Sequence, residues 1–265
     1  MLLRAPPSTS GAHLRLGTLS PPYLHYGPAP SLLPCLASAQ KPGVIVVLNV
    51  GDIVQSWPDL FATVPKLRSQ YPWAPVIVRV GSPSSDVTHL AGRAGQLHIR
   101  AVLADGEAIL ETLLPILTDA AALAPEAVEW LSLRGLRLNP ELSHLLTQIF
   151  THSARYSNVG DILRVIHEPE TSARFRCRKR GLPSPTSWLQ VARSLATALR
   201  IQAEPGTPLL TLAFELGFSS HSALSQQVYR AFGLRPGALR GTMGWEWLLS
   251  RWVERFVAPT SCDRA

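Results

Sequence analysis

Two segments of this chain carry polar side chains, at helical spacing, that are suited to binding nucleic acid. The first, Thr171–Arg180, has five Lys and Arg among its last seven residues, together with one phenylalanine. Arg can bind guanine through two hydrogen bonds, and any Arg or Lys can bind a phosphate. The second, His221–Tyr229, offers an imidazole, hydroxyls and amides, and Gln can pair with adenine. These residue types predict contact with the bases and phosphates of double-stranded DNA.

The second segment lies within Leu209–Arg240, which predicts two short helices around a tight turn. Gly217 can adopt the left-handed conformation that ends a helix and turns the chain. Three serines follow as candidate N-caps of the next helix: Ser219, Ser220 and Ser222. In that helix, apolar residues recur every four positions and form one buried stripe: Leu224, Val228 and Phe232. Two short helices with a polar outer face on the second are suited to reading the major groove.

The first segment predicts a similar pair of helices. Asp161–Ile166 is the expected support helix, 167–169 the turn, and Thr171–Arg180 the recognition helix. Ala173 and Cys177 are four residues apart, so they can point inward together. Gly, Leu and Pro at positions 181–183 end the helix.

The stretch Leu209–Arg240 resembles the second helix-turn-helix of the AraC/XylS family of bacterial transcription regulators. The matching positions are Gly217, Phe218, Ser219, Ser220, Ser222, Ser225, Phe232, Gly233, Pro236 and Arg240. Leu224 stands where the family usually has Phe, and Gln226 stands where it usually has Arg. The resemblance extends over residues 125–242.

The resemblance implies a regulator with two helix-turn-helix units, joined by a long helix that the sequence predicts at Ser184–Gln202. It implies these DNA-binding residues: Thr171, Arg174, Phe175, Arg178, His221, Ser222, Ala223 and Gln226. The candidates for phosphate contact or packing are Arg176, Lys179, Arg180, Tyr229, Arg230 and Arg240. Each helix-turn-helix unit is called a head from here on. Two heads on one rigid helix should enter successive major-groove turns, about 10 bp apart, on a non-palindromic site. RNA polymerase is an expected further partner.

The positive charge of the chain is concentrated around these segments. The formal net charge is +7, and residues 126–242 carry 14 Lys and Arg against 8 Asp and Glu. Residues 1–125 carry 8 against 7, and residues 243–265 carry 3 against 3. Such clustering supplies non-specific affinity for polyphosphate.

The sequence has no pattern typical of an enzyme, a metal site or a cofactor site. Cys35, Cys177 and Cys262 are too scattered for a disulfide framework or a zinc site, and no glycine-rich phosphate loop is present. The N-terminus lacks the apolar core of a signal peptide, and the apolar run Val44–Leu48 is too short to span a bilayer. We therefore expect no catalytic residue, no metal, no cofactor, no membrane partner and a cytoplasmic location.

The N-terminal half predicts an arm followed by a small α/β domain. Residues 1–40 are rich in Pro and Ser and predict an irregular arm. Residues 41–124 then alternate β-branched runs with segments of helical spacing. The runs are 43–49, 74–80 and 99–105, and the helical segments are Trp57–Gln70, Ser85–Gly95 and Glu107–Leu123. This alternation predicts a small parallel sheet of three strands with crossover helices.

This half is similar to a truncated response-regulator receiver. That family needs an acidic pair, a phospho-accepting Asp and a later Lys. Here the first run ends in Asn49, Val50, Gly51 and Asp52, and no lysine lies between Lys66 and Lys179. The resemblance therefore implies a degenerate receiver used for packing or for a homodimer through the N-terminal domain.

Residues 125–242 predict an all-helical DNA-binding domain, and 243–265 an amphipathic helix and tail. Besides those named above, helices are expected at Ala127–Leu133 and Pro140–Ser153, and the helix that contains Asp161–Ile166 is expected within Asn158–His167. In the last helix, aromatic and apolar residues at helical spacing are expected to cap the core: Trp245, Leu248, Trp252 and Phe256.

Two alternatives to a DNA-binding regulator remain open at this point. In the first, the α/β half binds a ligand or catalyses a reaction, because His89 and His98 flank the third run and Asp105 ends it. In the second, the helical half is a vestigial DNA-binding fold that acts through protein contacts only. Replacing Arg174 and Gln226 with Ala would then leave regulation intact.

Overall fold

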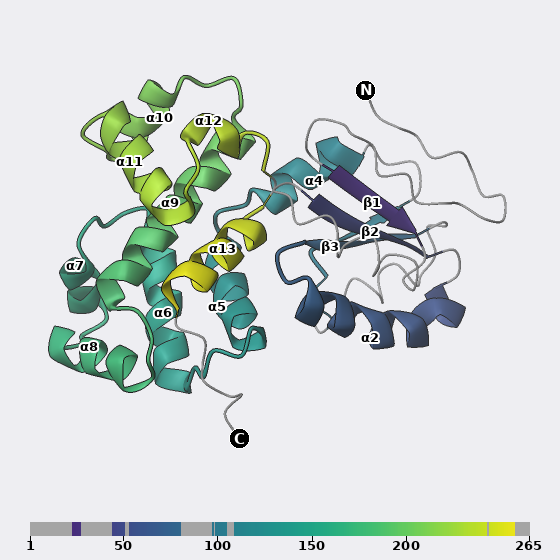
Figure 1. Cartoon of the computed structure of the whole chain (residues 1–265), viewed down its shortest axis with the longest axis horizontal. Helices are drawn as coiled ribbons and strands as arrows, with labels where there is room; N and C mark the ends of the chain where they lie inside the picture. Colours follow the sequence, from purple (N-terminus) through teal and green to yellow (C-terminus); the bar gives the residue numbers. More distant parts are fainter. Residues whose placement is uncertain are drawn as a thin grey trace. The chain divides into compact units, whose positions relative to one another are not determined.

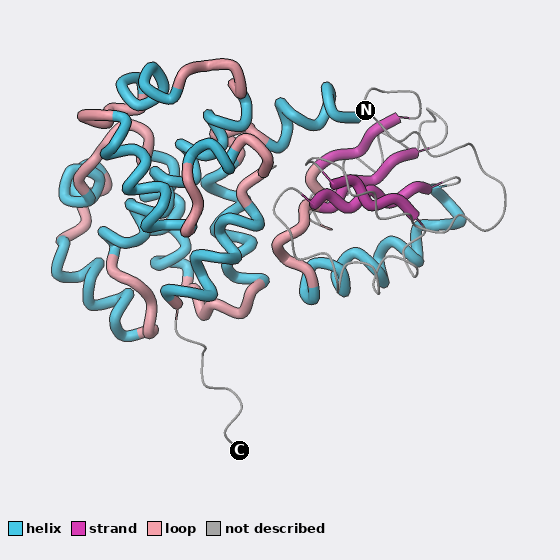
Figure 2. The backbone as a smooth tube through the Cα atoms, turned by 45° about the horizontal axis from the view of Figure 1, so that its top comes forward, coloured by secondary structure: helices cyan, strands magenta, loops and turns pink. Residues whose placement is uncertain are grey.

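The computed structural model describes residues 23–27, 44–50, 53–80, 97, 99–104, 109–242 and 244–257. The chain divides into two compact units. One comprises Met1–Leu117 with Gly241–Met243, and the other comprises Thr118–Arg240 with Gly244–Ala265. The first is built on a parallel sheet and the second is helical (Figures 1 and 2).

The sheet has four parallel strands that lie side by side in sequence order. They are β1 (Tyr23–Gly27), β2 (Val44–Val50), β3 (Val76–Val80) and β4 (Ala101–Ala104). The expected parallel sheet is therefore present, but with one strand more than the sequence indicated. The added strand, β1, falls in the stretch expected to be irregular. Its five residues are too few to stand out from the prolines and glycines around them, and pairing with β2 stabilises them.

Helix α4 (Ile109–Leu117) covers one face of this sheet. Its Leu113 and Leu117 pack against alternate residues of the strands: Ile45, Val47, Ile77 and Leu103. Val44, Val46 and Leu48, on the opposite face of β2, are also buried, which fits a parallel sheet covered on both faces. Helix α2 (Ile53–Gln70) connects β2 to β3 and buries Val64 and Leu67.

The helix boundaries in this region differ from the expected ones at two places. Helix α2 begins four residues before Trp57, and α4 ends at Leu117, well before Leu123. A turn follows α4, in which the Asp119 carboxylate accepts a hydrogen bond from the Ala121 N–H at 2.8 Å. The expected helix at Ser85–Gly95 lies outside the described residues.

The helical unit contains nine helices within its described residues. They are α5 (Leu123–Leu133), α6 (Pro140–His152), α7 (Val159–Val165), α8 (Glu170–Lys179), α9 (Pro185–Ala203), α10 (Leu209–Glu215), α11 (His221–Phe232), α12 (Pro236–Leu239) and α13 (Glu246–Phe256). Side-chain caps fix several of the starts. Asn139, Asn158, Ser184 and Ser220 each accept a hydrogen bond from a backbone N–H in the first turn of the helix that follows.

One continuous apolar core joins these helices, and tryptophan rings form its centre. Trp130 and Trp245 meet edge to face with ring centroids 6.0 Å apart, and Trp188 lies 4.8 Å from Trp252. Trp245 directly precedes α13, and Trp252 belongs to it. Leu248 of the same helix is also buried. Helix α13 therefore completes the core of the helical unit, as the apolar spacing predicted for Trp245, Leu248 and Trp252, whereas Phe256, the last residue of α13, is 45% exposed.

Candidate nucleic-acid interface

The helical unit contains the same three-helix arrangement twice. Helix α6 contacts α7 and α8, and α9 contacts α10 and α11 in the same order (Figure 1). Ile162 and Leu163 are buried in α7, and residues 50 positions later, Leu212 and Ala213, are buried in α10. The chain thus builds two similar helix pairs, α7–α8 and α10–α11, each packed on a longer preceding helix.

The turns inside the two helix pairs share three backbone hydrogen bonds at the same offset of 50 residues. In the first turn, the N–H groups of Ile166, His167 and Glu168 bond to the carbonyls of Ile162, Arg164 and Leu163, respectively. In the second turn, the N–H groups of Leu216, Gly217 and Phe218 bond to the carbonyls of Leu212, Phe214 and Ala213, respectively. The two turns therefore have the same backbone pattern.

This pattern needs a left-handed residue at its centre. Gly217 has φ 72° and His167, at the equivalent position, has φ 55°. Among the described residues, His167 is the only one other than glycine with a positive φ. Gly217 was visible as a turn signal in the sequence, whereas His167 takes this conformation without the glycine that normally marks it.

Helix α8 presents a cationic face to solvent. Ala173 and Cys177 are buried beneath it, as their spacing predicted. Thr171, Arg174, Phe175 and Arg178 are all exposed on its outer side. Arg174 forms an ion pair with Glu170 at 2.6 Å, and the Arg178 guanidinium lies 5.9 Å from the centre of the Phe175 ring. Lys179 and Arg180 are also exposed and extend the positive charge past the end of the helix.

Helix α11 presents a polar face with less charge. Leu224 and Val228 are buried beneath it, while His221, Ser222 and Gln226 are exposed. Ala223 is half-buried and packs against the core, so it is the least accessible of the four residues expected to bind DNA here. Tyr229 and Arg230 are exposed near the end of the helix.

Matching the buried pair of α8 to the buried pair of α11 sets the register between the two outer faces. Ala173 then corresponds to Leu224, and Cys177 to Val228, an offset of 51. The four residues of α8 that were expected to bind DNA consequently match four residues of α11: Ser222, Ser225, Gln226 and Tyr229. Sequence reasoning placed Tyr229 only among the phosphate or packing candidates and left Ser225 out of the site. Matching the two buried stripes at the sequence level would have found both.

A polar residue at an equivalent position ties each outer helix to the helix behind it. Arg176 of α8 bonds to Glu141 of α6 at 3.2 Å and also pairs with Glu168 of the turn. Its counterpart Gln227 donates to the Gln190 carbonyl and the Ser194 hydroxyl of α9, at 3.4 and 3.3 Å. Arg176 is therefore held within the protein, and Lys179 and Arg180 are better placed to meet a phosphate.

The second turn is fastened by Arg193 of α9. Its guanidinium donates to the Leu216 carbonyl at 3.5 Å and lies 5.2 Å from the centre of the Phe218 ring. Burial lowers the pKa of Arg193. In the first turn, the position of Phe218 is taken by Glu168, which pairs with Arg176. The second turn is thus held by the Arg193 cation over the Phe218 ring, and the first turn by the ion pair between Glu168 and Arg176.

The far end of α11 is held by arginines of α13, and the start of α10 by an arginine that follows α12. Arg251 donates to the Phe232 carbonyl at 2.9 Å, and Arg255 donates to the Arg230 carbonyl at 3.4 Å. Cations are favourable at the negative end of a helix dipole. Arg240 donates to the Thr207 carbonyl at 3.0 Å and so braces the start of α10.

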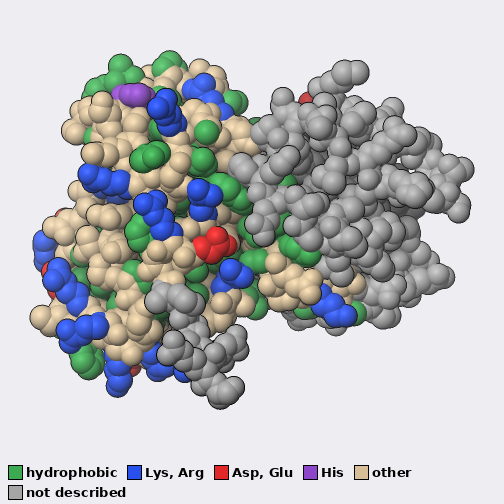
Figure 3. Space-filling view, viewed as in Figure 1, with side chains coloured by type: hydrophobic (Ala, Val, Ile, Leu, Met, Phe, Trp, Pro, Cys, Tyr) green, Lys and Arg blue, Asp and Glu red, His purple; other side chains and the backbone are tan. Residues whose placement is uncertain are grey.

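Lys and Arg are spread over the helical unit and gather around α8, whereas few Asp or Glu appear on the face in view (Figure 3). Helix α11 contains no acidic residue. An anionic polymer along the outer faces of α8 and α11 would therefore meet a positive potential, stronger at α8.

Cys177 is a core residue with little reactivity. Burial raises the pKa of its thiol to about 11, although the nearby Arg176 acts in the opposite direction. A thiol with this pKa is protonated at neutral pH and is a poor nucleophile.

Features of other site classes are missing from the described part of the chain. No cluster of three or more His, Cys, Asp or Glu side chains there is arranged to hold a metal ion. No helix in the same residues has the length and apolar character needed to cross a membrane. Comparison of the chain with protein-family models and with curated proteins gave no match.

Proposed function

We propose that the chain is a sequence-specific DNA-binding transcription regulator of the AraC/XylS type. In this proposal, α7–α8 and α10–α11 are two helix-turn-helix units, and α8 and α11 are their recognition helices. The observation that carries the proposal is the repeated helix pair. Both copies share one turn geometry, and each outer helix buries one stripe and carries polar or aromatic side chains at the corresponding outer positions. A helix of this size fits the major groove, which is about 12 Å wide.

The two heads divide the work of binding. Arg174, Arg178, Lys179 and Arg180 give the α8 head most of the charge for non-specific affinity. The α11 head carries less positive charge, and its Ser222 and Gln226 make hydrogen bonds to base edges. Because α9 connects the two pairs as one helix of 19 residues, both heads read one face of the duplex.

We propose that the α/β unit is a degenerate receiver-like domain, which pairs two copies of the chain or packs against a partner such as RNA polymerase. The strand order supports this proposal. A flavodoxin-like sheet has the order 2-1-3-4-5. If its second strand is missing, the remaining four lie in sequence order, as β1 to β4 do. A regulator of this kind acts on the chromosome in the bacterial cytoplasm, without a cofactor and without catalysis.

A mobility-shift titration with genomic fragments at two salt concentrations tests the proposed function. The expected result is a preferred fragment, with an affinity that falls steeply as salt rises from 50 to 200 mM, by roughly 10³-fold or more for six or more phosphate contacts. An affinity that ignores salt, or equal binding to all fragments, would favour a fold that acts through protein contacts.

A further inference from the structure

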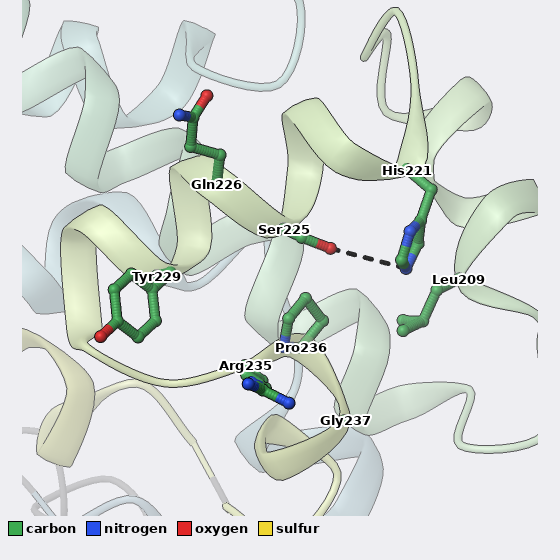
Figure 4. A pocket seen from close by; sticks show the side chains of 8 residues that line it. All are labelled: Leu209, His221, Ser225, Gln226, Tyr229, Arg235, Pro236 and Gly237. Carbon is green, nitrogen blue, oxygen red and sulfur yellow. Dashed lines mark hydrogen bonds between the residues drawn. The ribbon is translucent and has the colours of Figure 1, made fainter.

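A surface hollow of about 550 Å³ lies beside α11, where α10 and α12 begin (Figure 4). Three elements and the loop before α12 line it: Leu209 from α10, His221, Ser225, Gln226 and Tyr229 from α11, and Arg235, Pro236 and Gly237 at the start of α12. In the first head, the larger Arg174 stands at the position equivalent to Ser225. The small Ser225 and the missing side chain of Gly237 open the space in the second head.

The lining of the hollow is suited to an anion that carries an apolar part. It contains a guanidinium, an imidazole, two hydroxyls and an amide, and no carboxylate. Arg235 is exposed, and within the described part of the chain no ion pair involves it. Leu209 and Pro236 add apolar surface. A sugar–phosphate unit has this combination of a charged oxygen cluster and an apolar ring.

The position of the hollow relative to α11 decides which part of DNA reaches it. His221, Ser225 and Tyr229 are four residues apart and form one flank of the helix, with the hollow beside them. Ser222 and Gln226 are exposed next to that flank. A helix seated in the major groove has a sugar–phosphate strand along each side. The strand on the side of α12 must pass over the hollow.

We propose that this hollow seats the sugar–phosphate backbone of one DNA strand, with Arg235 and the Tyr229 hydroxyl on its phosphates. This proposal rests on the proposed function and adds to it a contact between the α11 head and the sugar–phosphate backbone. His221, Ser225 and Tyr229 then position α11 in the groove, and base discrimination in this head is left to Ser222 and Gln226.

Filling the hollow without changing its charge is the first test. Gly237 has no positive φ, and no atom lies within 4 Å of the place where a Cβ would be added, so Gly237→Leu can fold normally. Ala238→Leu, on the exposed neighbouring residue of α12, is the matched control. We expect Gly237→Leu to weaken binding roughly tenfold on every DNA sequence, with base preference unchanged, and Ala238→Leu to bind like the wild type.

Removing the charge is the second test. Arg235→Ala should lower the slope of log affinity against log salt by about 1 and weaken all sequences equally. Binding of Gly237→Leu and Arg235→Ala at the wild-type level would overturn the backbone seat but leave the proposed function standing. A changed base preference in either variant would also overturn it, because the hollow would then hold a base. If the wild type itself shows no salt-dependent DNA binding, both proposals fail together.

Discussion

At the scale of single residues, the two outer helices use different chemistry on the same frame. Arg174, Phe175 and Arg178 occupy the positions that Ser225, Gln226 and Tyr229 occupy 51 residues later. Two of the three in α8 are cations, whereas none in α11 is charged. Substitutions in α8 should therefore act mainly on affinity, and substitutions of Ser222 and Gln226 in α11 mainly on discrimination between sequences.

Gln226 is the residue of α11 whose substitution should change discrimination between sequences most. We expect Gln226→Ala to cost about 1–3 kcal/mol on the preferred site and little on other DNA, because a base-edge contact is lost. Lys179→Ala, at an exposed position of α8, should weaken all sequences alike and reduce the salt slope by about 1. Competition titrations with single-base variants of the site measure both. Equal losses on every sequence for Gln226→Ala would show that it contacts only the backbone.

Cys177 should make stability depend on pH in the alkaline range. Its pKa is raised from 9.0 to about 11 in the folded chain, so the protonated thiol is favoured by folding. This contribution is complete below pH 9 and is lost as pH rises through about 11. Denaturant titrations at pH 8 and 11 should show a smaller decline in the free energy of unfolding for Cys177→Ala than for the wild type. Identical declines would mean that the thiol is not buried in the folded chain.

At the scale of elements, the repeated turn is the feature on which both heads depend. It needs a left-handed residue, and the two copies meet this need with different residues. The ties behind α8 and α11 also differ, with an ion-paired Arg176 in one copy and a hydrogen-bonded Gln227 in the other. We therefore expect substitutions at the two left-handed positions to change the free energy of unfolding in opposite directions.

The turn residues allow a paired test. Gly217→Ala should lower the free energy of unfolding by about 1 kcal/mol, because a Cβ is strained at positive φ. His167→Gly should raise it by up to about 1 kcal/mol by relieving that strain. Thermal or urea denaturation of the two variants provides the comparison. A loss of stability in His167→Gly as large as that in Gly217→Ala would contradict the shared turn geometry.

Arg176 should act on stability more than on DNA affinity. Its side chain is about three-quarters covered, and Arg176→Ala leaves Glu168 without this partner. We expect a loss of about 1–3 kcal/mol in the free energy of unfolding, part of which Glu168→Gln restores in the double variant. Lys179→Ala should leave stability within about 0.5 kcal/mol of the wild type. An unchanged stability in Arg176→Ala, with a lower salt slope, would show that Arg176 meets a phosphate instead.

At the scale of the whole molecule, the sequence predicted the helical unit more completely than the sheet. The α10–α11 pair carries its own signals, namely Gly217, the serine caps and a stripe of large apolar residues. The α7–α8 pair was placed from a small buried pair, Ala173 and Cys177, and its helices differ from the expected bounds by one or two residues. The strand β1 was missed because its stability comes from pairing with β2, which local composition does not report.

The match between the two heads could not be read from identical residues. The positions that correspond at offsets of 50 and 51 hold different side chains almost throughout, including His167 against Gly217 and Glu168 against Phe218. What they share is burial, φ and hydrogen bonding, which only the folded chain displays. The same holds for the hollow beside α11, whose lining comes from segments up to 28 positions apart, Leu209 and Gly237.

Selection of DNA from a random pool, followed by sequencing, tests whether this chain reads DNA with two recognition helices. Two dissimilar heads on one linker helix predict enrichment of a non-palindromic site with two conserved blocks about 10 bp apart. In Gln226→Ala, one block should lose its preference while the other is retained. A pool that shows no enrichment, or a single conserved block that Gln226→Ala leaves unchanged, would contradict a two-headed reader of DNA.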